Sequence, residues 1–198
     1  MKKYVESLLL ESGGFQSKLK KIAEKCCEEH DGDIVEIGCL NGVTTNDLAL
    51  IAKKYNKKIW AVDPYEIGTQ NCQDESTYNE FIKNALTPHP LTVSLLRHSS
   101  LNPALIDIIK NKNLCFAYVD GLHTEEACFS DIMTVSHCTG VIAVDDFYAY
   151  DGSSRASHIK NVRSGLARAL VEFENKFDLI TSDSLKTKPS KTAYLIRK

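Results

Sequence analysis

The stretch "IVEIGCLNGVTT" at residues 34–45 decides the fold. It opens with β-branched apolar residues around a single acid, Glu36, as in a strand that is buried on both faces. It then breaks at Gly38 and Gly42 and continues into a helix-like pattern. A glycine-containing turn between a buried strand and a helix is typical of nucleotide sites in α/β proteins. The stretch therefore predicts a βα unit with a ligand at its turn.

The two glycines do not form the dinucleotide-binding fingerprint. That fingerprint, G-x-G-x-x-G, uses three glycines to bring backbone amides around a pyrophosphate. This chain has G-x-x-x-G, and Glu36 on the preceding strand would repel a phosphate. The pattern favours a nucleoside with cationic character, although a tight turn without a ligand is the alternative for this motif alone. Asp63, at the end of the next strand, favours the ligand because a carboxylate can accept both hydroxyls of a ribose.

Strand-like runs alternate with helix-like patterns along the rest of the chain. Strands are expected at 33–38, 58–63, 91–96, 114–120, 140–146, 177–182 and 192–197, and helices at 15–29, 44–55, 77–86, 102–110, 124–137 and 157–174. Thr44 or Thr45, Pro103 and Thr124 are the expected starts of three helices. The alternation predicts an α/β fold with a doubly wound, seven-stranded, mostly parallel sheet. Its last two strands should form an antiparallel hairpin, since no helix separates them.

Length and composition restrict the class of protein. The 198 residues suit one domain, 1–198, in which residues 1–30 form a helical segment that packs on the core. The net charge of −2 and the absence of like-charge runs do not favour nucleic acid or a membrane surface as partner. The chain has no 18-residue apolar span, and its seven cysteines lack zinc-ligand spacing. We expect reduced thiols in a cytoplasmic protein.

Acidic residues follow the strands at the edge of the sheet where ligands bind. Asp120 ends the fourth strand, and Asp145 and Asp146 end the fifth. No lysine or arginine accompanies these three carboxylates in sequence, and such oxygen ligands suit Mg²⁺, Mn²⁺ or Ca²⁺ rather than zinc. The alternative is that Asp145 and Asp146 only cap and solvate the strand end.

His123 follows Asp120 by three residues. An imidazole with a pKa of about 6.5 is suited to deprotonating a hydroxyl that a metal ion has acidified. His123 is therefore the candidate general base, and a capping or surface histidine is the alternative.

These motifs resemble those of a known family. "VEIGCLNGVTT" with "WAVDPY" resembles motif I and the following acidic motif of class I S-adenosylmethionine-dependent methyltransferases. "AYVDGLHTEEACFSDIMTVSHCTGVIAVDDFY" is similar to the macrocin O-methyltransferase branch, which acts on small molecules. The resemblance covers nearly all of residues 20–198. Asp146 stands where catechol-type methyltransferases usually have asparagine, which leaves the identity of the metal open.

The resemblance implies a role for each residue of the motifs. The cofactor-binding residues would be Glu36, Gly38, Asn41, Gly42, Asp63, Ser99, Ser100 and Asp120, with Asp63 on the ribose hydroxyls and Ser99 or Ser100 near the adenine. The metal ligands would be Asp120, Asp145 and Asp146, and His123 would be the general base.

The sequence thus predicts an S-adenosylmethionine-dependent O-methyltransferase assisted by Mg²⁺ or Mn²⁺. Its acceptor would be a hydroxylated small molecule, such as a sugar, glycoside or phenol, bound beside the polar stretches 66–77 and 148–158. A non-catalytic nucleoside-binding regulator is one alternative. An NAD-dependent oxidoreductase is another, disfavoured by the missing third glycine. The choice between a monomer and a homodimer stays open.

Overall fold

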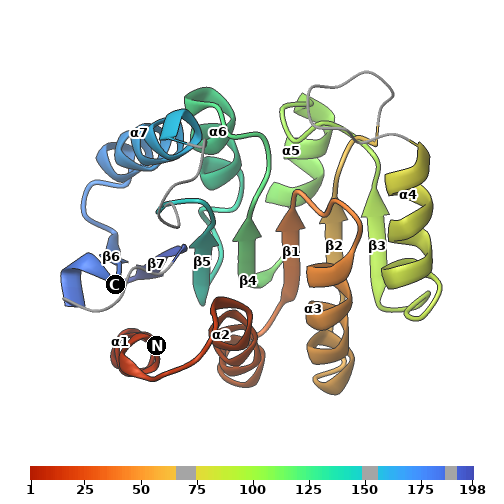
Figure 1. The fold of residues 1–198 in the computed structure, drawn as a ribbon, viewed down its shortest axis with the longest axis horizontal. Coiled ribbons are helices and arrows are strands. Elements are labelled where there is room, and N and C mark those ends of the chain that lie inside the picture. Colours follow the sequence, from red (N-terminus) through yellow and green to blue (C-terminus); the bar gives the residue numbers. More distant parts are fainter. Residues whose placement is uncertain (66–74, 149–155, 186–190) are drawn as a thin grey trace.

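The computed structural model describes residues 1–65, 75–148, 156–185 and 191–198 of the chain (Figure 1). Most of the two polar stretches expected beside the acceptor, 66–77 and 148–158, lies outside the described residues.

The described residues contain one seven-stranded sheet, and its strands lie in the order β3-β2-β1-β4-β5-β7-β6. The strands are β1 (Asp33–Ile37), β2 (Ile59–Val62), β3 (Val93–Leu96), β4 (Leu114–Val119), β5 (Val141–Val144), β6 (Phe177–Ile180) and β7 (Ala193–Arg197). Each lies inside its predicted range. All strand pairs from β3 to β5 are parallel, whereas β7 runs antiparallel to both β5 and β6. The predicted fold class and its C-terminal hairpin are confirmed.

Helices cover both faces of the sheet (Figure 1). One face carries α1 (Lys2–Leu10), α2 (Phe15–Glu29), α3 (Val43–Lys54), α4 (Glu75–Phe81) and the π-helical turn η1 (Ile82–Leu86). The other carries α5 (Pro103–Lys110), α6 (Glu125–Thr134) and α7 (Ala156–Glu172), and a short 3-10 turn, η2 (Asp183–Leu185), follows β6. Every residue of β4 and β5 is buried between these two layers, which explains their continuous apolar sequences. None of the described helices is long and apolar enough to cross a membrane.

Two of the three predicted helix starts are confirmed. Pro103 begins α5, and the Thr124 hydroxyl caps α6 by accepting a hydrogen bond from the Ala127 amide. The prediction that Thr44 or Thr45 caps α3 was wrong. Gly42 adopts a left-handed backbone conformation (φ +79°), so α3 begins at Val43 without a side-chain cap.

The first helices pack on the sheet near the carboxyl-terminal strands. Val5, Leu8 and Leu9 of α1 are buried in the same core as residues of α2, β1 and β4. Both ends of the chain meet at Asp178 of β6, whose carboxylate lies 3.1 Å from Lys2 Nζ and 3.7 Å from Lys198 Nζ.

Gly38, at the end of β1, allows two loops at the carboxyl edge of the sheet to touch. Its φ of +87° lies in the left-handed region, which favours glycine. A Cβ atom there would lie 2.0 Å from the carbonyl oxygen of Asp120, at the end of β4. The turn after β1 therefore contacts the backbone that carries Asp120.

We expect the substitution Gly38→Ala to destabilise the protein by about 2 kcal/mol or more, because it adds a steric clash to an unfavourable φ angle. Gly14→Ala is the matched control, since no atom lies within 4 Å of its Cβ position. Urea denaturation of both variants measures the difference. Equal stability of the two would show that the close approach at Gly38 is not a constraint.

Candidate active site

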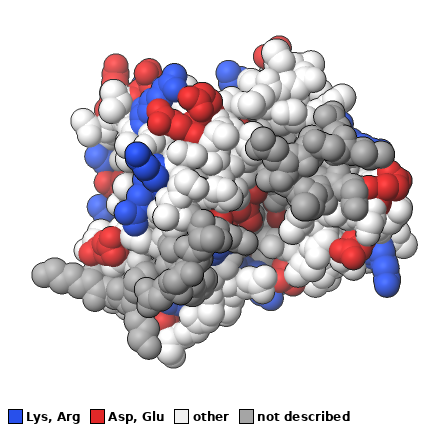
Figure 2. Space-filling view, turned by 45° about the horizontal axis from the view of Figure 1, so that its top comes forward, with Lys and Arg blue, Asp and Glu red and all other residues white. Residues whose placement is uncertain are grey.

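The acidic residues predicted from the sequence meet at the carboxyl edge of the sheet. Asp120 follows β4, whose neighbours in the sheet are β1 and β5. Asp145 and Asp146 follow β5, so the parallel pairing of these strands brings their ends to one place. Figure 2 looks towards this edge and shows acidic side chains at the middle of the face.

Asp120, His123 and Asp146 form a compact cluster. Nε2 of His123 lies 3.0 Å from Oδ2 of Asp146 and 3.5 Å from Oδ1 of Asp120. The other oxygen of Asp120 accepts a hydrogen bond of 3.3 Å from the Tyr118 hydroxyl. His158, in the first turn of α7, stacks on the His123 ring with 5.4 Å between ring centroids. The structure thus brings together three of the residues that the sequence motifs predict.

The two carboxylates control the charge of His123. Asp120 and Asp146 stabilise the imidazolium more than burial disfavours it, and they raise the pKa of His123 to about 9. Burial opposes the ionisation of Asp146, but His123 and Lys191 outweigh it and lower the pKa of this carboxyl well below its usual range. Without a metal ion, the cluster therefore holds a protonated histidine at neutral pH.

Asp145, the third predicted carboxylate ligand, is paired with other residues in this structure, and its role as a metal ligand stays a prediction. Its Oδ2 forms an ion pair with Lys191 Nζ, and its Oδ1 accepts a hydrogen bond of 3.0 Å from the Thr192 hydroxyl. Burial and the charge of Asp120 raise the pKa of Asp145 to about 6, so it is ionised at neutral pH and paired with Lys191. Among the described residues, the candidate ligand atoms that converge belong to Asp120, His123 and Asp146.

The cluster fits a divalent cation. The candidate ligand atoms of its three residues lie within 4.8 Å of one another. Nε2 of His123 lies within 3.5 Å of both carboxylates, so it is paired with them in this structure. The convergence of Asp120 and Asp146 is what fits a cation, because carboxylate oxygens are the ligands that Mn²⁺ and Mg²⁺ prefer.

Asp63 holds the glycine turn together. Its Oδ2 accepts hydrogen bonds from the amides of Cys39 (2.9 Å) and Leu40 (3.1 Å), and its Oδ1 accepts one from Tyr65 (3.3 Å). The Tyr65 hydroxyl donates to the Leu40 carbonyl at 2.6 Å, and Arg97 donates to the Tyr65 carbonyl at 2.9 Å. Asp63 thus shapes the turn, and its contact with a ribose stays a prediction.

Glu36 is buried in β1 beneath the turn, with 1% of its surface exposed. Neither carboxylate oxygen has a hydrogen-bond partner among the described residues. Burial, with smaller contributions from the charges of Asp120 and Asp63, raises the pKa of Glu36 to about 8. At neutral pH this carboxyl group is therefore mostly protonated, and a cationic ligand beside it would favour its ionised form.

The other predicted cofactor residues lie on the turns after β1 and β3. The Asn41 carbonyl accepts a hydrogen bond of 2.8 Å from Asn84, and Ser99 Oγ accepts one of 3.3 Å from the Leu101 amide. Ser100 lies beside the buried carboxyl of Asp131. The cofactor contacts of Asn41, Ser99 and Ser100 stay predictions.

Sequence reasoning missed several residues that shape the site. Tyr65 stands in the quoted motif "WAVDPY", so its position next to Asp63 was a usable signal. Lys191 gave no signal in the sequence, because it lies in a polar segment far along the chain from Asp145 and Asp146. Asp131 was missed as well, although it is buried and its carboxylate oxygens have no hydrogen-bond partner among the described residues.

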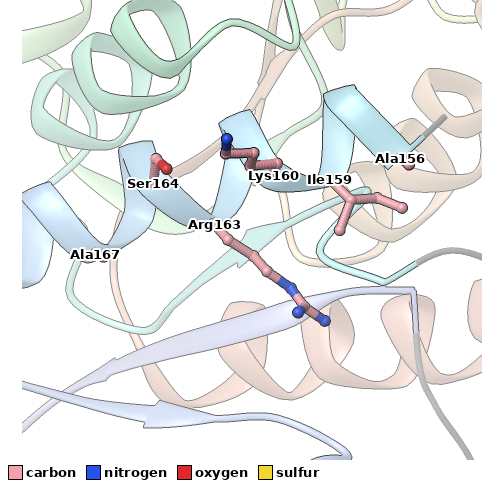
Figure 3. A pocket seen from close by; sticks show the side chains of 6 residues that line it. All are labelled: Ala156, Ile159, Lys160, Arg163, Ser164 and Ala167. Carbon is pink, nitrogen blue, oxygen red and sulfur yellow. The ribbon is translucent and has the colours of Figure 1, made fainter.

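A surface pocket of about 410 Å³ lies along α7 (Figure 3). It is lined by Ala156, Ile159, Lys160, Arg163, Ser164 and Ala167, none of which is a predicted site residue. Arg163 extends away from the helix and donates a hydrogen bond of 2.9 Å to the carbonyl of Phe147, the residue after Asp146. None of the residues that line the pocket belongs to the acidic cluster.

Comparison with known proteins finds similarity in structure only. No protein-family model and no curated protein sequence matches the chain. The fold is similar to that of the apo form of CalS11, a TDP-rhamnose 3'-O-methyltransferase of calicheamicin biosynthesis, with a TM-score of 0.65 and 16% identity over 90% of this chain and 77% of that one.

Two further structures match nearly the whole chain. Cofactor-bound Rv0187 from MTB has a TM-score of 0.65 and 13% identity, covering 98% of this chain and 86% of its own. An O-methyltransferase from Bacillus cereus, in complex with SAH, has a TM-score of 0.59 and 15% identity, covering 98% and 96%. The chain therefore has the fold of the class I S-adenosylmethionine-dependent methyltransferases that its motifs resemble.

Proposed function

We propose that this protein is an S-adenosylmethionine-dependent O-methyltransferase that acts on a small hydroxylated molecule with the help of a divalent cation. One observation carries the proposal: the glycine turn after β1 contacts the backbone of Asp120, which belongs to the cluster with His123 and Asp146. A cofactor on the turn and a hydroxyl at the cluster would therefore be neighbours. Proximity of this kind is what a methyl transfer requires.

The charge of the site supports S-adenosylmethionine as the cofactor. Its sulfonium and amino groups are cationic, and Glu36, Asp63 and Asp120 surround the glycine turn with carboxyl groups. The carboxyl groups of Asp63 and Asp120 disfavour the pyrophosphate of a dinucleotide, whereas Glu36, with a pKa of about 8, would be ionised only beside a cation. CalS11, whose fold this chain shares, is a methyltransferase of a nucleotide-linked sugar, which supports a sugar or glycoside as acceptor; a phenol is the other acceptor class we propose.

Asp120 and Asp146 are the carboxylates that would hold the cation, which would lower the pKa of the acceptor hydroxyl and orient it. His123 lies beside both carboxylates and takes the proton of that hydroxyl. Added positive charge in the cluster favours the neutral imidazole that this role needs. When bound, S-adenosylmethionine would supply the methyl group: the acceptor oxygen would bond to the methyl carbon as its bond to sulfur breaks, with S-adenosylhomocysteine as the product.

We also propose a cytoplasmic location. The six described cysteines are all free and buried, as is usual for proteins of a reducing compartment.

The first prediction of this proposal concerns the cofactor. Asp63→Ala should weaken binding of S-adenosylhomocysteine by about 2–3 kcal/mol, because it removes a charged acceptor for the ribose hydroxyls. Asp33→Ala is the control, since Asp33 begins β1 and accepts hydrogen bonds from Lys58 and Trp60 away from the turn. Calorimetry measures both affinities, and NAD serves as the competing ligand. Unchanged affinity in a folded Asp63→Ala protein, or preferential binding of NAD, would contradict the assignment.

A second prediction concerns the cation. Millimolar Mg²⁺ or Mn²⁺ should raise the melting temperature of the unmutated protein, because it binds the folded state and relieves repulsion between carboxylates. Asp120→Ala and Asp146→Ala should lose this response, which differential scanning calorimetry measures. If both variants respond to the ion as the unmutated protein does, these residues do not bind it.

A third prediction separates the base from the cation ligands. His123→Ala leaves both carboxylates in place, so the affinities for Mn²⁺ and S-adenosylhomocysteine should change little. Methyl transfer should fall by about 10²–10⁴-fold, the range for a lost general base. A screen of hydroxylated sugars and phenols must first supply an acceptor.

The pH profile gives the control for His123. The unmutated enzyme should lose rate as the pH falls and the imidazole becomes protonated, whereas the variant should lack this acid limb. A variant with near-full turnover and the same acid limb would assign the proton transfer to another group. A large loss of Mn²⁺ affinity would instead identify His123 as a ligand.

A further inference from the structure

Lys191 joins the two acidic residues that follow β5. Its ammonium forms an ion pair with Oδ2 of Asp145 and lies 2.8 Å from Oδ1 of Asp146. The second oxygen of Asp146, Oδ2, is the one that lies 3.0 Å from His123. The two oxygens of Asp146 thus have different neighbours, one at Lys191 and one in the cluster.

The register of β7 explains how Lys191 reaches this position. β7 runs antiparallel to β5, and Ala193 pairs with Val144. Continuing this register by two residues sets Thr192 opposite Asp145 and Lys191 opposite Asp146. The observed contacts agree, because the Thr192 hydroxyl bonds Asp145 and the amides of Phe147 and Tyr148 donate to the Lys191 carbonyl at 2.8 and 3.3 Å.

The backbone of Asp146 is strained. Its φ of +49° lies in the left-handed region, which is unfavourable for a residue with a side chain. Such a conformation persists only where its surroundings hold it in place. Lys191 supplies contacts on both sides of the strained residue, through its ammonium and through its carbonyl.

Lys191 also changes the charge that a cation would meet. Asp120, Asp145 and Asp146 together carry three negative charges when ionised, and the lysine reduces this to two. Its side chain is 22% exposed, and its ammonium contacts both carboxylates. With His123 neutral, as its proposed role as a base requires, a divalent ion would neutralise the two negative charges that remain.

We propose that Lys191 is a positioning residue: it holds Asp145 away from the cation site, so that the site offers two carboxylates and not three. This inference rests on the proposed function, because it concerns the cation that Asp120 and Asp146 would bind. It assigns a role to a residue outside every motif of the sequence.

Titration with Mn²⁺, followed by calorimetry and by electron paramagnetic resonance of the bound ion, tests the inference without an acceptor. Asp146→Asn should lose about tenfold or more in Mn²⁺ affinity, whereas Asp145→Asn should change it by less than about threefold, because only Asp146 is a direct ligand. Equal losses in the two variants would make Asp145 a ligand and overturn the inference.

A second set of variants tests the lysine itself. Lys191→Met should bind Mn²⁺ about tenfold more tightly, because a repelling charge is removed and Asp145 is released. Adding Asp145→Asn to Lys191→Met should abolish this gain, and Lys191→Arg should behave as the unmutated protein. Lys198→Met, at the other end of β7, is the control and should have no effect. Mn²⁺ affinity that is equal in Lys191→Met and the unmutated protein would overturn the inference.

The two proposals fail in different ways. If the unmutated protein binds no Mn²⁺, both the proposed cation site and the proposed role of Lys191 are wrong. Alternatively, Mn²⁺ binds to the unmutated protein and not to Asp120→Asn, while the Asp145 and Lys191 variants keep the affinity of the unmutated protein. In that case the cation site is supported and only the proposed role of Lys191 is wrong. Should Lys191→Met not fold, the Mn²⁺ affinities of Asp145→Asn and Asp146→Asn still show whether Asp145 is a ligand.

Discussion

The site depends on the close approach of two loops at the carboxyl edge of the sheet. β1 and β4 pair in parallel, and Gly38 at the end of β1 leaves no room for a side chain against the carbonyl of Asp120. This contact joins the turn that would hold the cofactor to the strand end that carries the acidic cluster. Asp63 then shapes the same turn from β2 by accepting hydrogen bonds from two of its amides. Each part of the arrangement follows directly from a strand whose residues are mostly buried.

Two carboxyl groups of the site are buried, and their burial changes how readily they ionise. Glu36 and Asp145 are almost fully buried, and burial raises the pKa of both. Asp145 is ionised at neutral pH and needs positive charge beside it, whereas Glu36 is mostly protonated and would be ionised only beside a cation. The protein supplies part of it from its own residues, Lys191 at Asp145 and protonated His123 between Asp120 and Asp146. The sulfonium of the cofactor and a divalent ion would supply further positive charge. The buried carboxyl groups are thus physically related to the proposed reaction.

The reversed strand contributes to function as well as to the sheet. Because β7 lies between β5 and β6, its first residues run back past the end of β5. Thr192 and Lys191 thereby reach both acidic residues, and the Lys191 carbonyl accepts hydrogen bonds from the backbone that follows them. Asp146 can then keep its left-handed conformation. An all-parallel sheet would have sent the last strand in the opposite direction and would have brought other residues to this place.

The sequence by itself determined the seven strands, their mostly parallel direction with a final hairpin, and the meeting of Asp120, His123 and the acids after β5 at one edge. These follow from local patterns, since apolar runs specify buried strands and the carboxyl ends of parallel strands lie together. It did not reveal that Asp145 is paired with Lys191 or that Asp63 bonds the glycine turn, and it misplaced the start of α3. Only the tertiary structure decided these points. The partner of a carboxylate depends on strand register and on backbone angles such as those of Gly42 and Asp146, which join residues far apart in the chain and leave no periodic pattern in its sequence.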